Sequence, residues 1–412
     1  MRPRILAATA LSALILASPA MAEELRFTVW TGNKAHLDML NGIAADFKET
    51  HPDVDVRFET IPAADYTQKL TFQLAGGNAP DLGWIMEDAA PTFADAGVLK
   101  DVGPALKSAE DYDYADFFGP AMGLWADGEA VWGIPFSTSP FMVYYNKDLF
   151  DQAGLEDPLT LAEKGEWTMD KFQEVAKAIK DETGTYGFEF KDGQGYASRQ
   201  MHALMPPIRA YGGKAWADGK CLFNAPEATA AVKQLHEMVF TDGSIVPPGE
   251  QGDYFSGGSA MTVNQISRAS KMPEAGFDWG IAPLPTGPGG NSPVIGQAGI
   301  AVFARGDNVD LATEFLAFMT NEDNVTTMAQ FFPPARKSVL ESAAFVESNK
   351  LIPAEQMKNV SAAISEGTVL PSHQQSPQIV AAMSPRVDAL WRADADVDKA
   401  LAAICDAIQP RL

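Results

Sequence analysis

The sequence predicts an α/β protein of two domains, and three observations support this prediction. Its 412 residues are too many for one small hydrophobic core. Residues 25–84 show the order strand, helix, strand, helix, strand, which is typical of a parallel sheet covered by helices. Residues 133–150 form an extended segment with apolar ends and a polar centre, which we interpret as a strand that crosses between two packed bodies.

The first 22 residues have the three parts of a secretory signal peptide. Arg2 and Arg4 form a basic n-region, residues 5–16 an apolar core, and residues 20–22 the cleavage site Ala-Met-Ala. The apolar run is shorter than the roughly 20 residues that a membrane-spanning helix needs. No cysteine follows the cleavage site to carry a lipid anchor. We therefore expect a soluble periplasmic protein whose mature chain begins at Glu23.

The first predicted unit alternates strands and helices. Strands are expected at residues 25–30, 54–58 and 81–84, where β-branched and aromatic residues recur. Helices are expected after Asn33 and after Asp65, two residue types that favour the N-cap position. Ligands of parallel sheets bind beyond the carboxyl ends of the strands. The loops after the first and third strands are therefore the candidate binding loops.

The crossing segment is predicted to be a strand followed by a helix. Pro135 and Pro140 exclude the interior of a helix, and Asn146 favours a helix start. The elements expected after it are a helix from Thr168, a strand at residues 186–188, a helix near residues 199–204 that ends at Pro206 and Pro207, a helix from Asn224, strands at residues 260–264 and 279–284, a return crossing at residues 294–303, a third crossing at residues 333–336 and a C-terminal helix at residues 397–408.

The charge balance is strongly acidic. Removal of the signal peptide leaves 29 basic against 54 acidic residues, a net charge of about −25. A protein without clusters of lysine and arginine cannot neutralise a phosphate backbone, so nucleic acid is excluded as a partner. A small anion is not excluded, because one local arginine can hold it. The excess of acidic residues otherwise indicates a well-solvated surface.

The sequence contains no recognisable catalytic or metal-binding motif, so neither an enzyme nor a cofactor is expected. It lacks G-x-S-x-G, H-E-x-x-H, Walker A and CxxC patterns, and its five histidines are scattered. Glu87 and Asp88 are adjacent, whereas glycosidases need two carboxyl groups on opposite sides of the bond. Cys221 and Cys405 form either a disulfide or two buried thiols, since their separation alone decides nothing.

Five short fragments add a resemblance to a known family. They are Asn-Ala-Pro-Asp-Leu at residues 78–82, the run from Pro-Phe-Ser-Thr-Ser-Pro to Tyr-Tyr-Asn-Lys-Asp-Leu-Phe at residues 135–150, Gly-Ser-Ala-Met at residues 258–261, Ala-Pro-Leu-Pro at residues 282–285 and Pro-Ala-Arg-Lys-Ser-Val at residues 334–339. In this order they resemble family 1 extracellular solute-binding proteins. These are the sugar-capturing subunits of ABC importers and are related to maltose-binding protein.

The resemblance implies a two-lobed periplasmic-binding-protein type II fold, in which both lobes are built from discontinuous sequence and three segments cross between them. After the signal peptide, residues 1–22, the N-lobe is expected to comprise residues 23–136 and 297–336. The C-lobe is expected to comprise residues 137–296 and 337–412. A ligand is expected in the cleft between the lobes.

The candidate ligand contacts combine the loops after the strands with the positions that the resemblance implies. Aromatic rings suit the apolar faces of a sugar, while carboxylates, amides and guanidinium groups suit its hydroxyls. The candidates are Asn33, Lys34, Trp84, Glu87, Asp88, Thr138, Ser139, Arg199, Gln200, His202, Asn264, Gln297 and Arg336. The structural alternatives are a core position for Trp84, helix capping for Asn33, Glu87 and Asp88, local backbone bonding for Thr138 and Ser139, and surface ion pairs for Arg199 and Arg336.

Two of these candidates bear on the kind of ligand. Asn264 is followed by residues 265–268, Gln-Ile-Ser-Arg, where the family often has an aromatic residue. This departure argues against a long stacked oligosaccharide. Arg336 lies at the expected third crossing, where a guanidinium group can bridge several hydroxyls or hold a carboxylate, phosphate or sulfonate.

The resulting hypothesis is a monomeric periplasmic protein that captures a carbohydrate by closure of two lobes and delivers it to the permease of an ABC importer. The alternative ligand is a phosphorylated or sulfonated sugar or polyol held by Arg336 or Arg199. A binding protein that serves a chemoreceptor fits the sequence equally well. The alternative from another class is a secreted glycoside-active enzyme.

Overall fold

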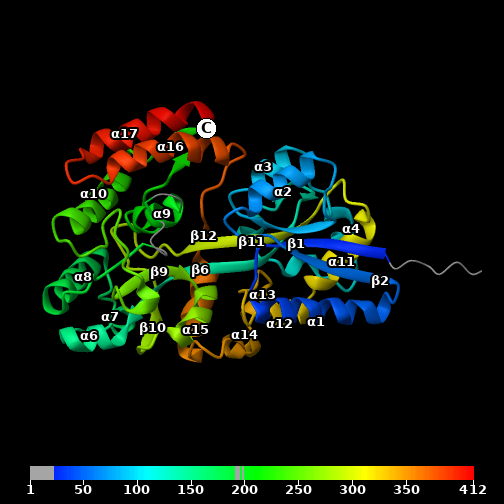
Figure 1. The fold of residues 1–412 in the computed structure, drawn as a ribbon, viewed down its shortest axis with the longest axis horizontal. Helices are drawn as coiled ribbons and strands as arrows, with labels where there is room; N and C mark the ends of the chain where they lie inside the picture. The colour runs from blue at the N-terminus through cyan, green and yellow to red at the C-terminus, as the bar shows by residue number, and fades with distance from the viewer. Residues whose placement is uncertain (1–22, 191–194, 197–198) are drawn as a thin grey trace, which may run out of the picture.

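The computed structural model describes residues 23–190, 195–196 and 199–412, so the expected signal peptide lies outside the described residues. The described chain forms two lobes joined by long strands (Figure 1), which confirms the predicted two-lobed α/β fold. The N-lobe contains β1 (Glu23–Val29), α1 (Lys34–Thr50), β2 (Val54–Thr60), α2 (Tyr66–Ala75), β3 (Leu82–Met86), α3 (Ala90–Asp95), α4 (Gly103–Ser108), η1 (Tyr114–Asp116), α5 (Gly119–Met122), β4 (Ala126–Asp127), β5 (Ala130–Val131), α11 (Val309–Met319) and α12 (Glu322–Met328).

The C-lobe is mainly helical on its outer side (Figure 1). It contains α6 (Lys147–Ala153), α7 (Pro158–Glu163), α8 (Met169–Thr183), α9 (Gln200–Ala210), β7 (Trp216–Ala217), β8 (Lys220–Cys221), α10 (Pro226–Phe240), η3 (Tyr254–Ser256), β9 (Met261–Gln265), η4 (Ile266–Glu274), β10 (Trp279–Ala282), α16 (Ser376–Leu390), α17 (Val397–Ile408) and η5 (Gln409–Arg411). The junction contains β6 (Ile134–Asn146), β11 (Val294–Val302), α13 (Lys337–Leu340), α14 (Ala343–Ser348), α15 (Ala354–Glu366) and β12 (Thr368–Val369).

The N-lobe sheet has the predicted parallel order. β1 pairs in parallel with β2 on one side and with β3 on the other. The side chain of Asn33 caps α1 by accepting hydrogen bonds from the N–H groups of Ala35 and His36, as its residue type predicted. The carboxyl ends of β1 and β3 therefore lie on the same edge of the sheet, and their loops meet there.

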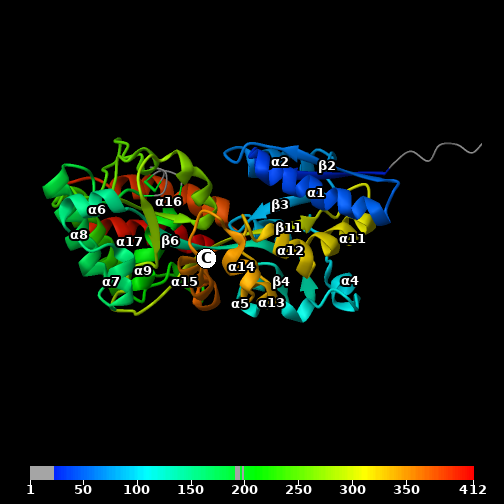
Figure 2. The same ribbon diagram turned by 90° about the horizontal axis from the view of Figure 1, so that it is seen from below.

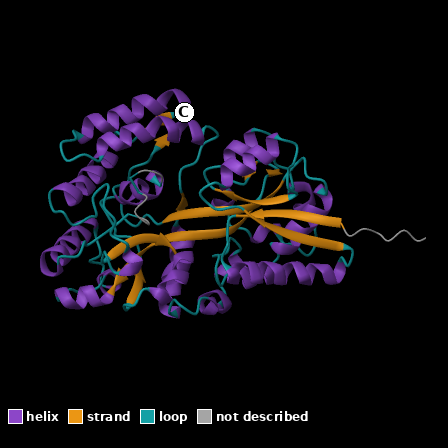
Figure 3. Ribbon diagram, viewed as in Figure 1, coloured by secondary structure: helices purple, strands orange, loops and turns teal. Residues whose placement is uncertain are grey.

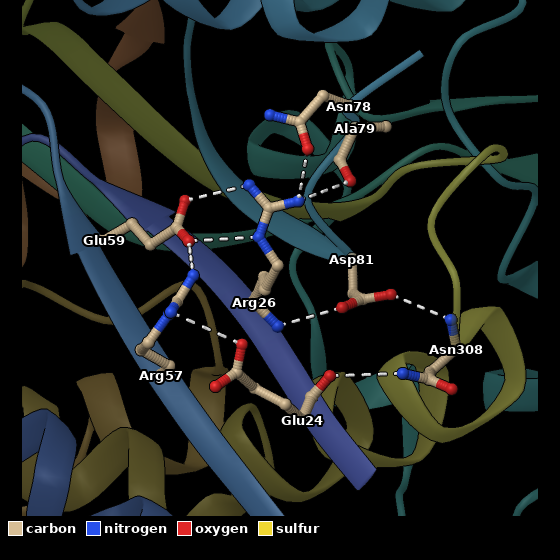
Figure 4. A network of polar contacts seen from close by, with 8 residues as sticks. All are labelled: Glu24, Arg26, Arg57, Glu59, Asn78, Ala79, Asp81 and Asn308. Carbon is tan, nitrogen blue, oxygen red and sulfur yellow. Dashed lines mark hydrogen bonds and ion pairs between the residues drawn. The ribbon is translucent and has the colours of Figure 1, made fainter.

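The Asn-Ala-Pro-Asp motif at residues 78–81 ties this sheet together (Figure 4). Asp81 accepts hydrogen bonds from the backbone N–H groups of Arg26 and Asn308, at 2.9 and 2.8 Å. The guanidinium group of Arg26 donates to Asn78 and, in an ion pair, to Glu59. This motif therefore holds the start of β3 against β1 and the start of α11, on the side of the sheet away from the binding loops.

One sheet passes through both lobes (Figure 3). The first half of β6 pairs antiparallel with β11, from Ile134 to Pro140, and its second half pairs with β9 and β10 in the C-lobe. β11 also pairs antiparallel with β3 of the N-lobe and parallel with β12. β6 and β11 are thus the first two crossings, as predicted. The third begins at residues 333–336, where the carbonyl of Pro333 accepts from the N–H of Thr138.

Two hydrophobic cores fill the molecule. The first lies in the N-lobe and continues under β6, where α15 packs on β6 and β10 through Met357 and Val360. Seen from below, α14 and α15 lie at the junction of the lobes (Figure 2). The second core lies among the C-lobe helices. The lobe division at the residues predicted above stays a prediction.

Two local predictions were wrong. The helix near residues 199–204 does not end at Pro206 and Pro207 but runs on to Ala210. The two prolines lack only their own N–H donors, and the N–H of Tyr211 still bonds to the carbonyl of Pro207, so the helix continues. Residues 186–188 form isolated bridges rather than a strand, because each bridged residue pairs with a different segment.

Cys221 and Cys405 form a disulfide between β8 and α17, which decides between the two alternatives left open by the sequence. Both cysteines are buried in the second core. Within the described ranges, no helix combines the length and apolar character needed to cross a bilayer.

Candidate ligand-binding cleft

A cleft of about 540 Å³ lies where the two lobes meet. This volume is within the range of about 300–1,000 Å³ that is usual for small-molecule sites. The N-lobe side is lined by Trp30, Thr31, Asn33, His36, Trp84, Glu87 and Phe332. The floor is formed by Ser137, Ser139, Gly296, Gln297 and Ala298 of the crossing strands. The C-lobe side is lined by Arg199, His202, Gln265, Ser267, Arg268, Ser270, Lys271 and Glu274.

The N-lobe wall is aromatic. Trp84 is only 1% exposed, because its ring packs against Trp30, Phe136 and Phe332 at centroid distances of 4.8, 4.7 and 5.6 Å. Trp84 is therefore a buried support of this wall, whereas the ring of Trp30 is only partly buried. The sequence predicted Trp84 as the aromatic contact; the structure makes Trp30 the better placed of the two.

His36 adds a neutral polar group to this wall. Its Nδ1 lies 3.0 Å from the hydroxyl of Thr31, and its ring packs against Phe331 and Phe332 at 4.6 and 4.9 Å. Burial lowers the pKa of His36 to about 4. The imidazole is therefore uncharged at neutral pH, and it can both donate and accept a hydrogen bond. The sequence analysis did not select this residue.

Glu87 and His202 meet across the cleft. Glu87 follows β3 in the N-lobe, His202 lies in the first turn of α9 in the C-lobe, and their side chains are 3.5 Å apart. Arg199, the N-cap residue of α9, also lines the cleft. Asp88 and Gln200 instead line a smaller adjoining pocket of about 60 Å³. The predicted acidic loop and the predicted α9 segment are thus brought together.

The strand register decides which floor residues face the cleft. Alternate residues of a strand point to opposite faces, and paired residues share a face. Gly296 pairs with Ser139, and Ala298 pairs with Ser137 and Met86, and all of these residues line the cleft.

The intervening pair is Gln297 and Thr138, and its hydrogen bonds are made within the N-lobe core. The amide of Gln297 donates to the carbonyl of Ala121 and to the hydroxyl of Thr138, and it accepts from the indole N–H of Trp125. Thr138 is fully buried and does not line the cleft. Gln297 itself still borders the cavity.

Arg336 lies outside the cleft, buried in the N-lobe with 1% of its surface exposed. Its guanidinium group donates to the carbonyls of Thr320, Tyr112 and Asp113 at 2.8, 2.6 and 3.1 Å. It also forms an ion pair with Asp116 at 3.3 Å. These partners fix the loop between α4 and α5 to the third crossing, so the structure gives Arg336 a set of contacts different from those predicted.

Two other predicted residues also lie away from the cleft lining. Lys34 is exposed and forms an ion pair with Asp38 one turn further along α1. Asn264 is fully buried in β9, where its amide donates to the hydroxyl of Thr262. Its neighbour Gln265 has the opposite orientation along the strand and lines the cleft.

One group of residues that the sequence analysis missed lies in η4, directly after β9. Ser267, Arg268, Ser270 and Lys271 border the cleft from the C-lobe. They occupy the place where the sequence showed no aromatic residue, and the position after a strand end was the signal that could have identified them. This wall is polar and carries basic groups, unlike the aromatic wall opposite.

Comparison with known proteins identifies the family. Residues 36–326 match the family model described as bacterial extracellular solute-binding protein. An arabinooligosaccharide-binding protein of Halalkalibacterium halodurans is 26% identical over 354 residues, which cover 80% of this chain and 75% of that protein. The sn-glycerol-3-phosphate-binding periplasmic protein of Escherichia coli is 25% identical over 344 residues, which cover 77% of this chain and 76% of that protein.

Solved structures show the same fold. An ABC substrate-binding protein of Listeria monocytogenes in complex with cycloalternan superposes with a TM-score of 0.81 at 22% identity, and the match covers 94% of this chain and 98% of that one. The family model extends over well more than half of the residues, and the superposition covers both lobes. The chain therefore belongs to the family of bacterial extracellular solute-binding proteins.

Proposed function

We propose that this protein captures a carbohydrate in the periplasm and delivers it to an ABC importer. The observation that carries the proposal is a cleft whose three sides come from the two lobes and from the strands that join them. One wall is aromatic and the other is polar, which matches the two kinds of surface that a sugar presents. The relatives named for arabinooligosaccharide and for sn-glycerol 3-phosphate support a hydroxylated ligand.

Capture requires contacts to both lobes at once. A ligand stabilises the closed arrangement only by the contacts that it makes there and not in the open one. From the predicted set, we propose Asn33, Glu87, Ser139, Arg199 and His202 as contacts, because each lines the cleft. To these we add Trp30, His36, Gln265 and Arg268. No chemical step is needed in this function, which is binding and release.

A second ligand class is favoured by the basic residues of the C-lobe wall. Arg199, Arg268 and Lys271 line the cleft in a chain whose overall charge is strongly negative. A phosphorylated or sulfonated sugar or polyol would place its anionic group on this wall. The sequence analysis proposed Arg336 or Arg199 for this role; because Arg336 is buried in the N-lobe, we propose that Arg268 and Lys271 accompany Arg199 instead.

The proposal is tested by a thermal-shift screen of the mature chain against neutral mono-, di- and trisaccharides, polyols, and phosphorylated or sulfonated sugars. A ligand that binds only the folded state raises its stability by about 2.7 kcal/mol at a hundredfold excess over Kd. A neutral sugar that raises Tm supports the first class. Hits confined to anionic compounds support the second. Absence of any hit among these compounds refutes both.

Delivery to a permease is tested separately. The acidic surface is proposed to assist docking on basic loops of the permease, and such long-range attraction is screened by salt. Added salt should then lower transport in membrane vesicles more than it lowers sugar binding. Equal loss of both would contradict the proposed docking.

A further inference from the structure

At Gly296 the floor of the cleft leaves room for a side chain from another strand. Gly296 in β11 is the register partner of Ser139 in β6, and both line the cleft. A methyl group on Gly296 would overlap the side-chain amide of Gln265, which comes from β9 of the C-lobe. Three strands therefore meet at one point of the floor. β11 contributes no side chain there, β6 contributes the hydroxyl of Ser139, and β9 contributes the amide of Gln265.

The hydroxyl of Ser139 is buried, and it has no hydrogen-bond partner among the described residues. The whole residue is only 2% exposed. A buried hydroxyl without a partner destabilises the folded protein, so native proteins keep few of them. Such an atom at the floor of a cleft indicates a group that is supplied from outside the chain. Ser259 has the same kind of unpartnered hydroxyl but does not line the cleft, and so it provides a matched control.

We propose that the ligand places one hydroxyl group at this point of the floor, between Ser139 and Gln265. The proposal rests on the proposed function, because it takes the ligand to be a sugar, a polyol or one of their derivatives. A ligand hydroxyl has one donor and two acceptor positions, so it can bond to the serine hydroxyl and to an amide together. The absence of a side chain at Gly296 gives the amide of Gln265 its place against the backbone of β11.

The proposal also assigns a specificity. A ligand that has a hydrogen atom in place of this hydroxyl leaves Ser139 unpartnered, and a site built around a hydroxyl discriminates strongly against such an analogue. A bulkier group there would overlap the side chains of Ser139 and Gln265. The position therefore selects a free hydroxyl on one carbon of the ligand, whatever charged group the C-lobe wall accepts elsewhere.

The experiment compares Ser139→Ala, Gly296→Ala and Ser259→Ala by titration calorimetry. The probes are the sugar or polyol that raises Tm most in the screen and the set of its monodeoxy analogues. Ser139→Ala should weaken binding of the parent compound about fivefold, the effect of one lost hydrogen bond. Gly296→Ala should weaken it more than tenfold, because its methyl group displaces the amide of Gln265. Ser259→Ala should bind like the wild type.

One analogue identifies the hydroxyl. The monodeoxy compound that lacks it should bind wild type and Ser139→Ala equally, as in a double-mutant cycle. The proposal is overturned if Ser139→Ala binds the parent compound as the wild type does, or if it loses the same factor for every analogue. Failure of the proposed function is distinct, since the wild type would then bind none of these compounds. Thermal unfolding without ligand checks the folding of each variant, and Ser139→Ala should unfold no earlier than the wild type.

Discussion

Replacement of Arg336 by methionine should destabilise the N-lobe and leave ligand binding intact. The substitution keeps much of the packing but removes the donors to three backbone carbonyls and the ion pair with Asp116. Leaving a buried carbonyl group without its donor costs about 1–3 kcal/mol, whereas Asp116 is only half-buried and keeps its hydrogen bonds from Ser338. The guanidinium group also stacks on the rings of Phe117 and Tyr112, at 4.4 and 4.8 Å. Mainly because three carbonyl groups lose their donor, we expect the free energy of unfolding to fall by about 4 kcal/mol.

The assay is urea unfolding of the mature chain, and Arg57→Met is the matched control. Arg57 also pairs with carboxylates, but its side chain is 54% exposed, so its loss should cost less than about 1 kcal/mol. Affinity for the screened ligand should change less than about twofold in Arg336→Met. Equal stability of the two variants would refute the reasoning. Stability retained with a large loss of affinity would instead restore Arg336 as a ligand contact.

Asp116 gives the same prediction a dependence on pH. Burial raises the pKa of Asp116, but hydrogen bonds from Ser338 and Arg336 outweigh this effect and hold the pKa below its usual value. A carboxyl group with a lowered pKa stabilises the fold above its unfolded pKa of about 3.9, and this contribution is lost as the pH falls through the folded value. The difference in stability between wild type and Arg336→Met should therefore shrink below about pH 4.

Three further predictions concern stability. Replacement of Cys221 and Cys405 by serine opens a loop of 184 residues and should lower the free energy of unfolding by up to about 5 kcal/mol. The measurement is urea unfolding, with the oxidised wild type as reference, and an unchanged midpoint would contradict this prediction. The pKa of His36 is about 4 in the folded protein, so between about pH 6.5 and pH 4 the unfolded chain binds a proton that the folded chain does not. The free energy of unfolding therefore falls as the pH is lowered from 6.5 to 4. His36→Gln should remove about 2 kcal/mol of that decline, after allowance for the partial exposure of the ring. An equally steep decline in the variant would exclude His36 as its source. Asp81→Ala should cost about 3 kcal/mol, because two backbone N–H groups lose their acceptor, and Asp81→Asn, which retains an acceptor, should cost less in the same assay.

The sequence could predict those parts of the fold that depend on local chemistry. Asn33 begins α1, as its residue type indicates, and the helix ends at His51, directly before Pro52. Asn146 and Thr168 likewise cap the helices that follow them. The alternation in residues 25–84 led to the parallel sheet, because the periods of strands and helices are set by the nearest neighbours in the chain.

The candidate site could be predicted only in part, because a cleft is formed by distant segments. Glu87 and His202 were both expected there, but their contact depends on how α9 lies against the end of β3. The sequence analysis predicted Asn264 as a contact, but its neighbour Gln265 lines the cleft, because a shift of one residue along a strand reverses the face that a side chain occupies. Arg336 was chosen for its position in a motif, but its orientation follows from carbonyl groups more than 200 residues earlier in the chain.

The strands shared by the two lobes have a consequence for any attempt to divide the molecule. β6 pairs with β9 and β10 of the C-lobe, β11 pairs with β3 of the N-lobe, and the two strands pair with each other, so that one sheet links the lobes. A cut in either strand would leave an open sheet edge on each fragment, and such an edge pairs readily with other chains. The lobes are therefore not separable building blocks, and a reporter domain inserted into either strand would abolish folding. The lobe closure proposed above would therefore have to bend this single sheet at β6 and β11.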